Sequence, residues 1–527
     1  MSADASLLHP AMEWKPKHSP WIIAVSVILP TCLEVLDTTI TSVALNHIAG
    51  NLAATYDEAT WVLTSYLISN AIVLPASGWL SRYLGRKPFF MTCIGLFTFA
   101  SFLCGAARSI QFLIWMRVFQ GVGGGALQPM SHSILMESFP PHQRGSAMAV
   151  FGLGVVFAPT IGPTLGGWIT DNFSWPWIFY INLPVGALAL FMIHRFVEDP
   201  PYLRAAKPGR IDAIGFALLA VWLGTLQIIF DKGQIEDWFE SDFIVRLSVI
   251  SGIAFVLFLW RELSTPEPIV DLRILKNLNF TLCCLLVGTV GISIYGTITA
   301  QPMFLQTLLG YNAYNTGIAM STRGIASMVG MPLCAILIRK FDTRLLIAFG
   351  FMMFSLSSHV YHKTVTLDVG MWNIFLPNIV QGFGTSFMFV PITTTAMSQL
   401  RQNQLGNAAG IYNLSRNLGG SLGVALLTTF IARNAQIHQV QLAAHLTPYD
   451  MSCRIWLDHA QHNLSRFLGE SNSGPAALKA LYGVLVQQSY LSAFSQAFHL
   501  LSLLSFSLLF LIPILRRTRP GGAPGSH

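Results

Sequence analysis

Charged residues are scarce in this sequence of 527 residues. Asp, Glu, Lys and Arg together make up only 10% of the chain, whereas soluble globular proteins have about 25%. Hydrophobic residues reach 53%, and the mean hydropathy is +0.55. So few charges cannot cover the surface of a soluble protein of this length. The composition therefore predicts an all-α polytopic membrane protein.

Several chemical signatures are also missing. No Walker motif occurs, so ATP does not drive the protein directly. Six of the seven cysteines lie in apolar segments, and none has the spacing of a zinc site. Gly121-x-Gly123-x-x-Ala126 matches a dinucleotide fingerprint by letter, but it lies in a predicted membrane helix and follows no strand. We therefore expect no metal and no cofactor.

Apolar runs of the length that crosses a bilayer, about 20 residues, occur fourteen times. They lie at residues 21–43, 60–81, 88–107, 112–136, 146–169, 175–195, 212–230, 243–262, 280–301, 314–338, 343–362, 371–397, 408–432 and 493–515. Lys and Arg crowd the loops on one side, whereas the short loops on the other side have only Arg108, Lys232 and Lys363. The positive-inside rule predicts that both termini are cytoplasmic. Because the basic residues serve insertion, we expect no nucleic-acid partner.

The chain repeats itself. Gln120-Gly121-x-Gly123 recurs as Gln381-Gly382-x-Gly384, and Gly162 recurs as Gly423, both 261 residues later. Two parallel six-span repeats are the architecture of the major facilitator fold, whose substrate site lies between the halves. The predicted divisions are a cytoplasmic segment 1–20, an N-terminal six-helix bundle 21–197, a linker with two extra transmembrane helices 198–279, a C-terminal six-helix bundle 280–515 that includes a periplasmic extension 433–492, and a cytoplasmic tail 516–527.

Four motifs occur in order in the expected spans. Residues 36–45 read LDTTITSVAL, and Gly78-x-Leu-Ser-Arg82-x-x-Gly85-Arg86-Lys follows span 2. Arg117-Val-Phe-Gln120-Gly-x-Gly lies in span 4, and residues 154–167 read GVVFAPTIGPTLGG. The chain resembles the fourteen-span drug:proton antiporters of the EmrB/QacA type, although Arg82 stands where their loop motif has Asp. That resemblance implies multidrug efflux and antibiotic resistance, powered by the proton gradient across the cytoplasmic (inner) membrane.

Two acids lie well inside an apolar span, Glu34 and Asp37. An intramembrane carboxylate costs a few kcal/mol and is a functional candidate by default. Three residues apart, both acids share one helix face. Asp37 and Arg117 lie about 8–9 Å below the outer boundary at 1.5 Å per residue, so we predict an Asp–Arg pair that protonation would break. Glu34, Asp37 and Arg117 are the proton-coupling candidates, and the sequence leaves open which acid titrates or whether one acid only neutralises Arg117.

Span 5 has small residues every four positions and two prolines, which allow close helix packing and bending. We expect gating or structural roles for this set and for the loop motif, although plain positive-inside bias also explains the loop cations. The residues are Gly78, Arg82, Gly85, Arg86, Gly154, Ala158, Pro159, Gly162, Pro163, Gly166 and Gly167.

Arg323 and Arg416 have no intramembrane acid nearby in sequence, which favours lipophilic weak acids as substrates, unless both arginines only cap carbonyls. Polar and flexible side chains suit a promiscuous cavity or serve as structural hydrogen bonds. The cavity candidates are Gln120, Gln128, Arg323, Asn378, Gln381, Met388 and Arg416.

Residues 433–492 form a long outer extension, in which Pro475 is predicted to open an amphipathic helix. The resemblance implies contact with a periplasmic adaptor (a membrane fusion protein) and an outer-membrane channel, but a helix on the bundle or the lipid surface fits equally. The alternatives to multidrug efflux are export of one natural metabolite or siderophore and, from another class, a non-transporting membrane enzyme or scaffold.

Overall fold

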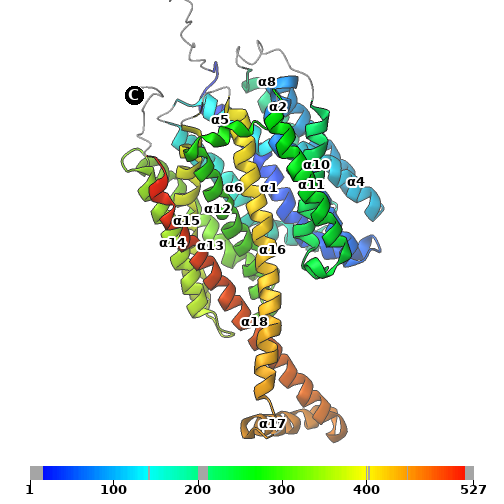
Figure 1. Ribbon diagram of the computed structural model, residues 1–527. Coiled ribbons are helices and arrows are strands. Elements are labelled where there is room, and N and C mark those ends of the chain that lie inside the picture. The colour runs from blue at the N-terminus through cyan, green and yellow to red at the C-terminus, as the bar shows by residue number, and fades with distance from the viewer. Residues whose placement is uncertain are drawn as a thin grey trace, which may run out of the picture.

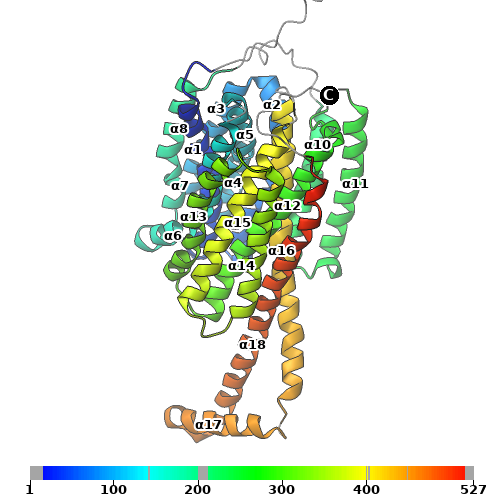
Figure 2. The same cartoon turned by 90° about the vertical axis from the view of Figure 1, so that its left-hand side faces the viewer.

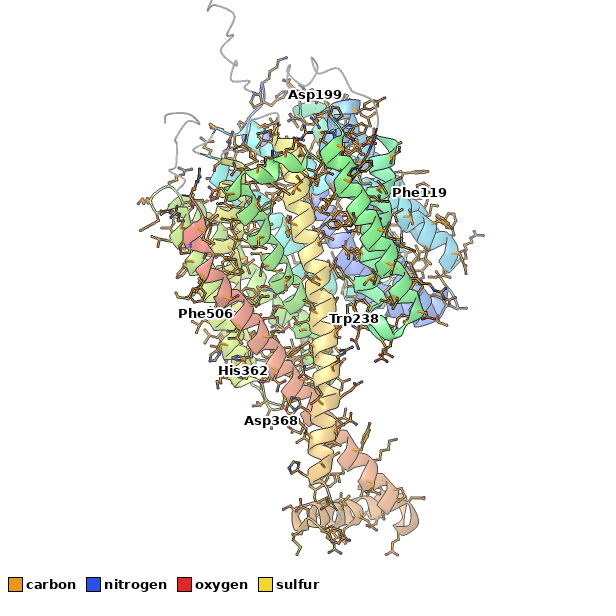
Figure 3. All side chains as sticks on the ribbon, in the orientation of Figure 1. Phe119, Asp199, Trp238, His362, Asp368 and Phe506 are labelled. Carbon is orange, nitrogen blue, oxygen red and sulfur yellow. The ribbon has the colours of Figure 1, made fainter. Side chains whose placement is uncertain are left out.

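The computed structural model describes residues 16–140, 143–199, 212–266, 268–398, 400, 404–447 and 449–516. Most of the predicted N-terminal segment, nearly all of the C-terminal tail and residues 200–211 of the predicted linker lie outside this set. The described residues form helices and connecting turns, with no strand among them. Apolar side chains such as Phe119 and Phe506 project from the periphery of the helices, where lipid would surround them (Figure 3).

Eight helices make up the first bundle: α1 (Pro20–Asn51), α2 (Tyr56–Leu84), α3 (Arg86–Gly105), α4 (Ile110–Gly124), α5 (Leu127–Ser138), α6 (Arg144–Asn172), α7 (Trp177–Tyr180) and α8 (Asn182–Phe196). The start of α2 has a capping box, in which the Thr55 hydroxyl accepts from the Glu58 N–H and the Glu58 side chain accepts from the Thr55 N–H. Predicted span 4 is two helices rather than one, because the chain turns at Gly125 and Ala126 between α4 and α5.

Two further helices, α10 (Ala213–Lys232) and α11 (Asp242–Ser264), follow with a short turn, η3 (Trp238–Glu240), between them. This hairpin contacts both bundles near the end where it turns. Lys232 Nζ donates to Thr60 Oγ1 of α2 at 2.6 Å, and Trp238 Nε1 donates to Thr429 Oγ1 of the second bundle at 3.1 Å (Figure 3).

The second bundle contains α12 (Leu278–Met303), continued by the π turn η5 (Phe304–Leu308), then α13 (Ala313–Leu337), α14 (Thr343–Thr364), α15 (Met371–Ser398), α16 (Leu405–His445), α17 (Met451–Leu468) and α18 (Glu470–Ser507). Eleven helical segments of the described chain are long and apolar enough to span a membrane. The other three predicted spans are the α4–α5 pair, α6 and α16, which are also helical.

The helices continue well beyond the apolar runs on one side. Helix α16 ends at His445 rather than near residue 432, and α18 begins at Glu470, so Pro475 lies inside α18 and does not open it. Residues 433–492, called the stalk below, project from the bundle, and α17 crosses their far end (Figures 1 and 2). The predicted start of the amphipathic helix at Pro475 was wrong, because a helix can begin before a proline that lies in its first turns. The apolar runs mark spans and not helix ends, since a helix continues as long as its backbone bonds are satisfied.

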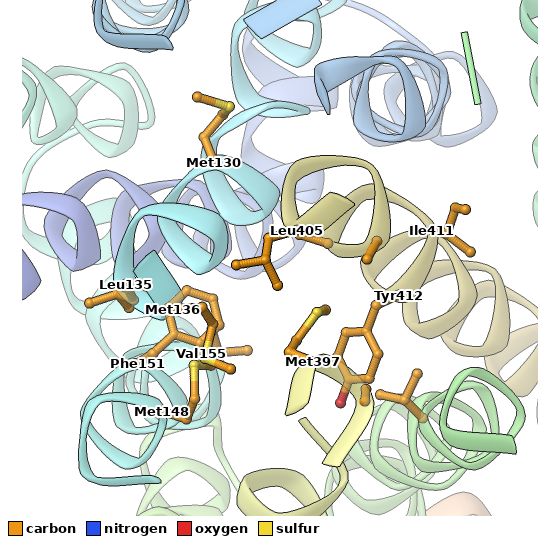
Figure 4. Packing of buried hydrophobic residues seen from close by; sticks show 14 of the residues in the cluster. Met130, Leu135, Met136, Met148, Phe151, Val155, Met397, Leu405, Ile411 and Tyr412 are labelled. Carbon is orange, nitrogen blue, oxygen red and sulfur yellow. The ribbon is translucent and has the colours of Figure 1, made fainter. Parts of the chain in front are cut away.

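The largest buried core joins the two bundles. Side chains of α5 and α6, including Met136 and Phe151, face Met397 of α15 and Tyr412 of α16 (Figure 4). The ring centroids of Phe151 and Phe389 lie 6.5 Å apart across this interface. The two bundles are therefore packed closely against each other here.

Candidate functional site

Asp37 is buried in an ion pair. Its Oδ2 lies 2.5 Å from Arg117 Nη1, and both side chains are fully shielded from solvent. Its Oδ1 accepts from Gln120 Nε2 at 3.0 Å and from Asn182 Nδ2 at 2.7 Å. The predicted Asp–Arg pair is thus confirmed, and Asp37 accepts three hydrogen bonds, one of them from a cation.

The Arg117 side chain is fixed independently of the acid. Its Nε donates to the Val62 carbonyl of α2 at 3.0 Å, and its guanidinium carbon lies 4.2 Å from the centre of the Tyr66 ring. Nη1 also donates to Gln120 Oε1 at 2.7 Å. A guanidinium held on three sides positions the carboxylate of α1 firmly against α2 and α4.

Glu34 lies one helical turn away from Asp37 and has different partners. Its Oε1 accepts from Asn70 Nδ2 of α2 at 3.0 Å, and its Oε2 accepts from Gln128 Nε2 of α5. Both donors are neutral amides. Gln128 Oε1 in turn accepts from Arg416 Nη2 of α16. Gln128 therefore links a buried acid of the first bundle to a buried arginine of the second.

A cavity of about 30 Å³ lies between the bundles, with Arg323 and Arg416 in its wall. The rest of the lining is mostly apolar and includes Pro159, Ile298 and Phe389. Sites for drug-sized molecules have about 300–1,000 Å³. The bundles are therefore closed around this point, and a substrate needs them to separate.

The two arginines have few partners. Arg323 Nη1 donates to Gln381 Oε1 at 3.2 Å, and Arg416 Nε and Nη1 are buried without any hydrogen bond. Arg416 and Arg323 are 3% and 4% exposed. Within the described ranges neither forms a salt bridge to an acid. A wall with two cations and mostly apolar neighbours is suited to an anion with an apolar body.

The other cavity candidates lie elsewhere. Gln120 belongs to the Asp37 cluster and Gln128 to the Glu34 cluster, while Asn378 accepts from Gln301 Nε2 at 2.9 Å. Gln381 contacts Arg323. Met388 is fully buried in the hydrophobic core, where its backbone lies against Gly350 of α14. None of these five lines the closed cavity, so their contact with substrate stays a prediction.

Glycines bring the acid-bearing helix close to its neighbours. A Cβ at Gly154 would lie 2.6 Å from Cys32 Sγ, and one at Gly162 would overlap Thr39, both on α1. Gly166 lies against Ile40 of α1, whereas Gly167 has open space beside it. The predicted small-residue stripe of α6 thus packs on the helix that holds Glu34 and Asp37. Ala158 is buried in the same helix, where Pro159 and Pro163 remove backbone donors.

The loop motif lies at the opposite end of the bundle from the stalk. Gly85 has φ +87°, which a side chain would strain, and it separates α2 from α3. Arg86 forms a buried salt bridge to Glu137, whereas Arg82 is exposed and pairs with no acid in the part of the chain described. A Cβ at Gly78 would lie 2.8 Å from the backbone of Gly406, so the two bundles touch here.

The sequence did not predict several residues that form hydrogen bonds or ion pairs with the candidate site residues. Asn70 and Asn182 contact the two acids from α2 and α8, and Glu137 pairs with Arg86 from the end of α5. The asparagines were detectable only as polar residues within apolar runs. Nothing local in the sequence indicates that Arg416 would face Gln128, 288 residues away.

Comparisons with known proteins agree on one family. The family model described as Major Facilitator Superfamily matches residues 27–424. The chain is 36% identical to "Multidrug export protein EmrB" of Escherichia coli (strain K12), over 81% of this chain and 83% of that protein. It is 34% identical to "Fatty acid resistance protein FarB" of Neisseria gonorrhoeae, over 94% and 96%. The solved structure of the proton:xylose symporter XylE matches with a TM-score of 0.61 at 13% identity, covering 95% of this chain and 97% of that one, which shows the fold alone.

Proposed function

This chain belongs to the major facilitator superfamily as an EmrB-like member, and from that premise we propose that it exports lipophilic drugs and toxic weak acids in exchange for protons. The proton gradient is the energy source, and no cofactor is needed. The observation that carries the proposal is Glu34, a buried acid at the interface of the bundles whose direct donors are both neutral amides.

The contacts favour Glu34 over Asp37 as the proton carrier. Asp37 is neutralised by the Arg117 guanidinium, so protonating it would leave a buried cation without its partner. Glu34 loses two amide hydrogen bonds at most when it takes up a proton. We assign Asp37 and Arg117 to holding α1, α2 and α4 in register, and Glu34 to binding and releasing the proton.

The path from Glu34 to the second bundle supplies the coupling. Ionised Glu34 attracts Arg416 through Gln128, which favours a closed interface between α1, α5 and α16. Protonation removes that attraction and changes the relative populations of the arrangements that the two bundles can take. A proton on one residue of α1 thereby changes the relative stability of two arrangements of the whole molecule.

The cavity lining supports the substrate class. Two arginines without acid partners among the residues described, set in apolar walls, favour lipophilic compounds with an acidic group. The fatty acid resistance protein among the relatives has a name consistent with such substrates. The rest of the lining is suited to apolar ligands of varied shape, as a multidrug exporter requires.

We place the protein in the inner membrane with both termini in the cytoplasm, so the stalk lies in the periplasm. Tyr449 and Phe467 of the stalk are 94% and 87% exposed. Val440, Met451 and Leu478 of the stalk are exposed as well, and a large exposed apolar surface is typical of an interaction site, whereas single exposed side chains are not. We propose that this surface binds a periplasmic adaptor, which would pass substrate to an outer-membrane channel.

Proton exchange is tested in everted membrane vesicles whose membrane contains the protein. The measurement is the uptake of a lipophilic acid driven by a proton gradient. Glu34→Gln should abolish gradient-driven transport, because the amide can no longer carry a proton. Glu262→Gln is the matched control, since Glu262 is also a buried acid, 2% exposed, but lies in α11 outside the two-bundle interface. Gradient-driven transport by Glu34→Gln at the wild-type rate would contradict the assignment.

The same preparations test the adaptor. Vesicles contain no periplasm, whereas resistance of whole cells requires passage through it. Tyr449→Ser with Phe467→Ser should lower whole-cell resistance far more than it lowers vesicle transport. Equal effects in both assays would argue against a partner at the stalk.

A further inference from the structure

The two arginines in the cavity wall have different surroundings. Arg416 is linked to an acid, because Gln128 accepts from it and donates to Glu34. Arg323 is linked to an amide, because its Nη1 donates to Gln381 Oε1 at 3.2 Å. The sequence gives no reason to separate them, but the contacts do.

An anion bound to Arg416 would raise the proton affinity of Glu34, which is the opposite of what exchange requires. It would take away the cation that stabilises ionised Glu34, and Glu34 would then bind a proton more readily. Because linkage is reciprocal, the proton and the anion would favour each other's binding. Ligands that load together are cotransported, whereas exchange requires that they do not load together.

Arg323 avoids this conflict. An anion at Arg323 leaves the contacts of Glu34 with Asn70 and Gln128 in place. Its guanidinium is held by Gln381, and it has no acid partner in any described segment. Gln381 is 1% exposed, and its Nε2 is a buried donor without a hydrogen-bond partner. The site thus offers a cation with one bond satisfied and, next to it, an unused amide donor.

We propose that Arg323, oriented by Gln381, binds the carboxylate of anionic substrates, and that Arg416 belongs to the proton side of the mechanism. The proposal rests on the proton exchange argued above. When the bundles separate, the carboxylate accepts from the free guanidinium nitrogens of Arg323 in a charge-assisted pair. Ile298, Phe354 and Phe389, which line the same cavity, contact the apolar chain of the substrate.

The test compares an acid with its uncharged amide. Full-length protein in lipid nanodiscs is dialysed to equilibrium against radiolabelled octanoate or octanamide, with empty nanodiscs subtracted. Arg323→Gln should weaken octanoate binding about tenfold or more, the size expected for a lost hydrogen bond between charged groups, and should shift octanamide binding much less. Arg416→Gln should change octanoate binding by less than about threefold. Arg246→Gln, at an exposed site of α11, is the matched control.

Gln381→Leu supplies a second, milder variant. Because Gln381 orients the guanidinium and supplies a neutral donor but no charge, its loss should weaken octanoate binding less than Arg323→Gln does, in the same direction. Selective loss of octanoate in Arg416→Gln, or equal loss in both arginine variants, would overturn the proposal. The wild type could transport neutral drugs under a proton gradient and yet bind octanoate no better than octanamide. That result would overturn the role of Arg323 but would leave the proposed proton exchange intact. A wild type without gradient-driven transport would instead contradict the proposed function.

Discussion

The two bundles use the same repeat positions in opposite ways. Arg117-Val-Phe-Gln120 in α4 corresponds to Asn378-Ile-Val-Gln381 in α15, 261 residues later. In the first bundle the arginine pairs with Asp37. In the second bundle Asn378 takes the place of the arginine and contacts neutral groups, while Gln381 accepts from Arg323.

The second bundle retains a buried hydrogen-bond network around Asn378 but has no ion pair there among its described residues. Asn378 accepts from Gln301 Nε2 and donates to the Ala319 carbonyl, both at 2.9 Å, and Gln301 Nε2 also donates to the Tyr361 hydroxyl at 2.6 Å. No buried acid of the described second bundle joins this network, which leaves Arg323 free of an acidic partner. In the mechanism that we propose, the first bundle therefore binds the proton and the second binds the anion. A duplicated fold can divide exchange in this way because its halves share a frame but not their polar residues.

The largest loss of stability is expected when Arg117, the charged member of the Arg117/Asn378 pair of repeat positions, is replaced. Arg117→Leu would leave Asp37 buried without a cation and should cost about 3–5 kcal/mol of stability. Asn378→Leu, at the matching position, removes two neutral hydrogen bonds and should cost about 1–3 kcal/mol. Thermal unfolding of the two purified variants measures the difference.

A double variant separates the pair from the packing. Asp37→Asn combined with Arg117→Leu removes the unpaired charge, so it should be more stable than Arg117→Leu alone. If Arg117→Leu and Asn378→Leu destabilise equally, the contrast between a charged and a neutral bundle is wrong.

The sequence predicted local features better than distant ones. Fourteen helical segments and the Asp37–Arg117 pair follow from hydropathy and helix rise, because both depend only on distance along the chain and depth in the membrane. The break between α4 and α5 was missed because a run of glycines at 123–125 looks the same in a continuous apolar helix. The bridge from Glu34 through Gln128 to Arg416 was missed because it depends on how α16 is rotated against α5, which hydropathy does not determine.

A second pair of repeat positions compares a glycine that packs against a side chain with a glycine that packs against backbone. Gly162 of α6 and Gly423 of α16 correspond, and each lies against the first helix of its bundle. A methyl at Gly162 would overlap Thr39 Oγ1, which can rotate away, and would lie 2.7 Å from Thr39 Cβ, which cannot. A methyl at Gly423 would meet three backbone atoms of Ile292 within 2.9 Å, the nearest being Cα at 2.5 Å, and none of them can rotate away. Gly423→Ala should therefore cost about 2–3 kcal/mol and Gly162→Ala about 1 kcal/mol.

Gly167→Ala is the control for both, because no atom lies within 4 Å of its added methyl. There the better helix propensity of alanine should leave stability unchanged or slightly higher. Unfolding midpoints of the three variants give the order. A larger loss for Gly162→Ala than for Gly423→Ala would show that α1 is the more rigid neighbour.

The smallest effect is expected at two corresponding loop arginines. Gly78-Trp-Leu-Ser-Arg82 recurs 257 residues later as Ala335-Ile-Leu-Ile-Arg339, and both arginines are exposed. Arg339 Nη2 donates to Ser146 Oγ of the other bundle at 3.1 Å, whereas Arg82 forms no ion pair among the residues the structure describes. An exposed hydrogen bond contributes about 0.5–1 kcal/mol, so Arg339→Gln should change the transport rate by less than about fivefold and Arg82→Gln should leave it unchanged. Because Arg339 bonds to the other bundle, a change confined to Arg82→Gln would mean that the first loop acts through contacts made when the bundles separate.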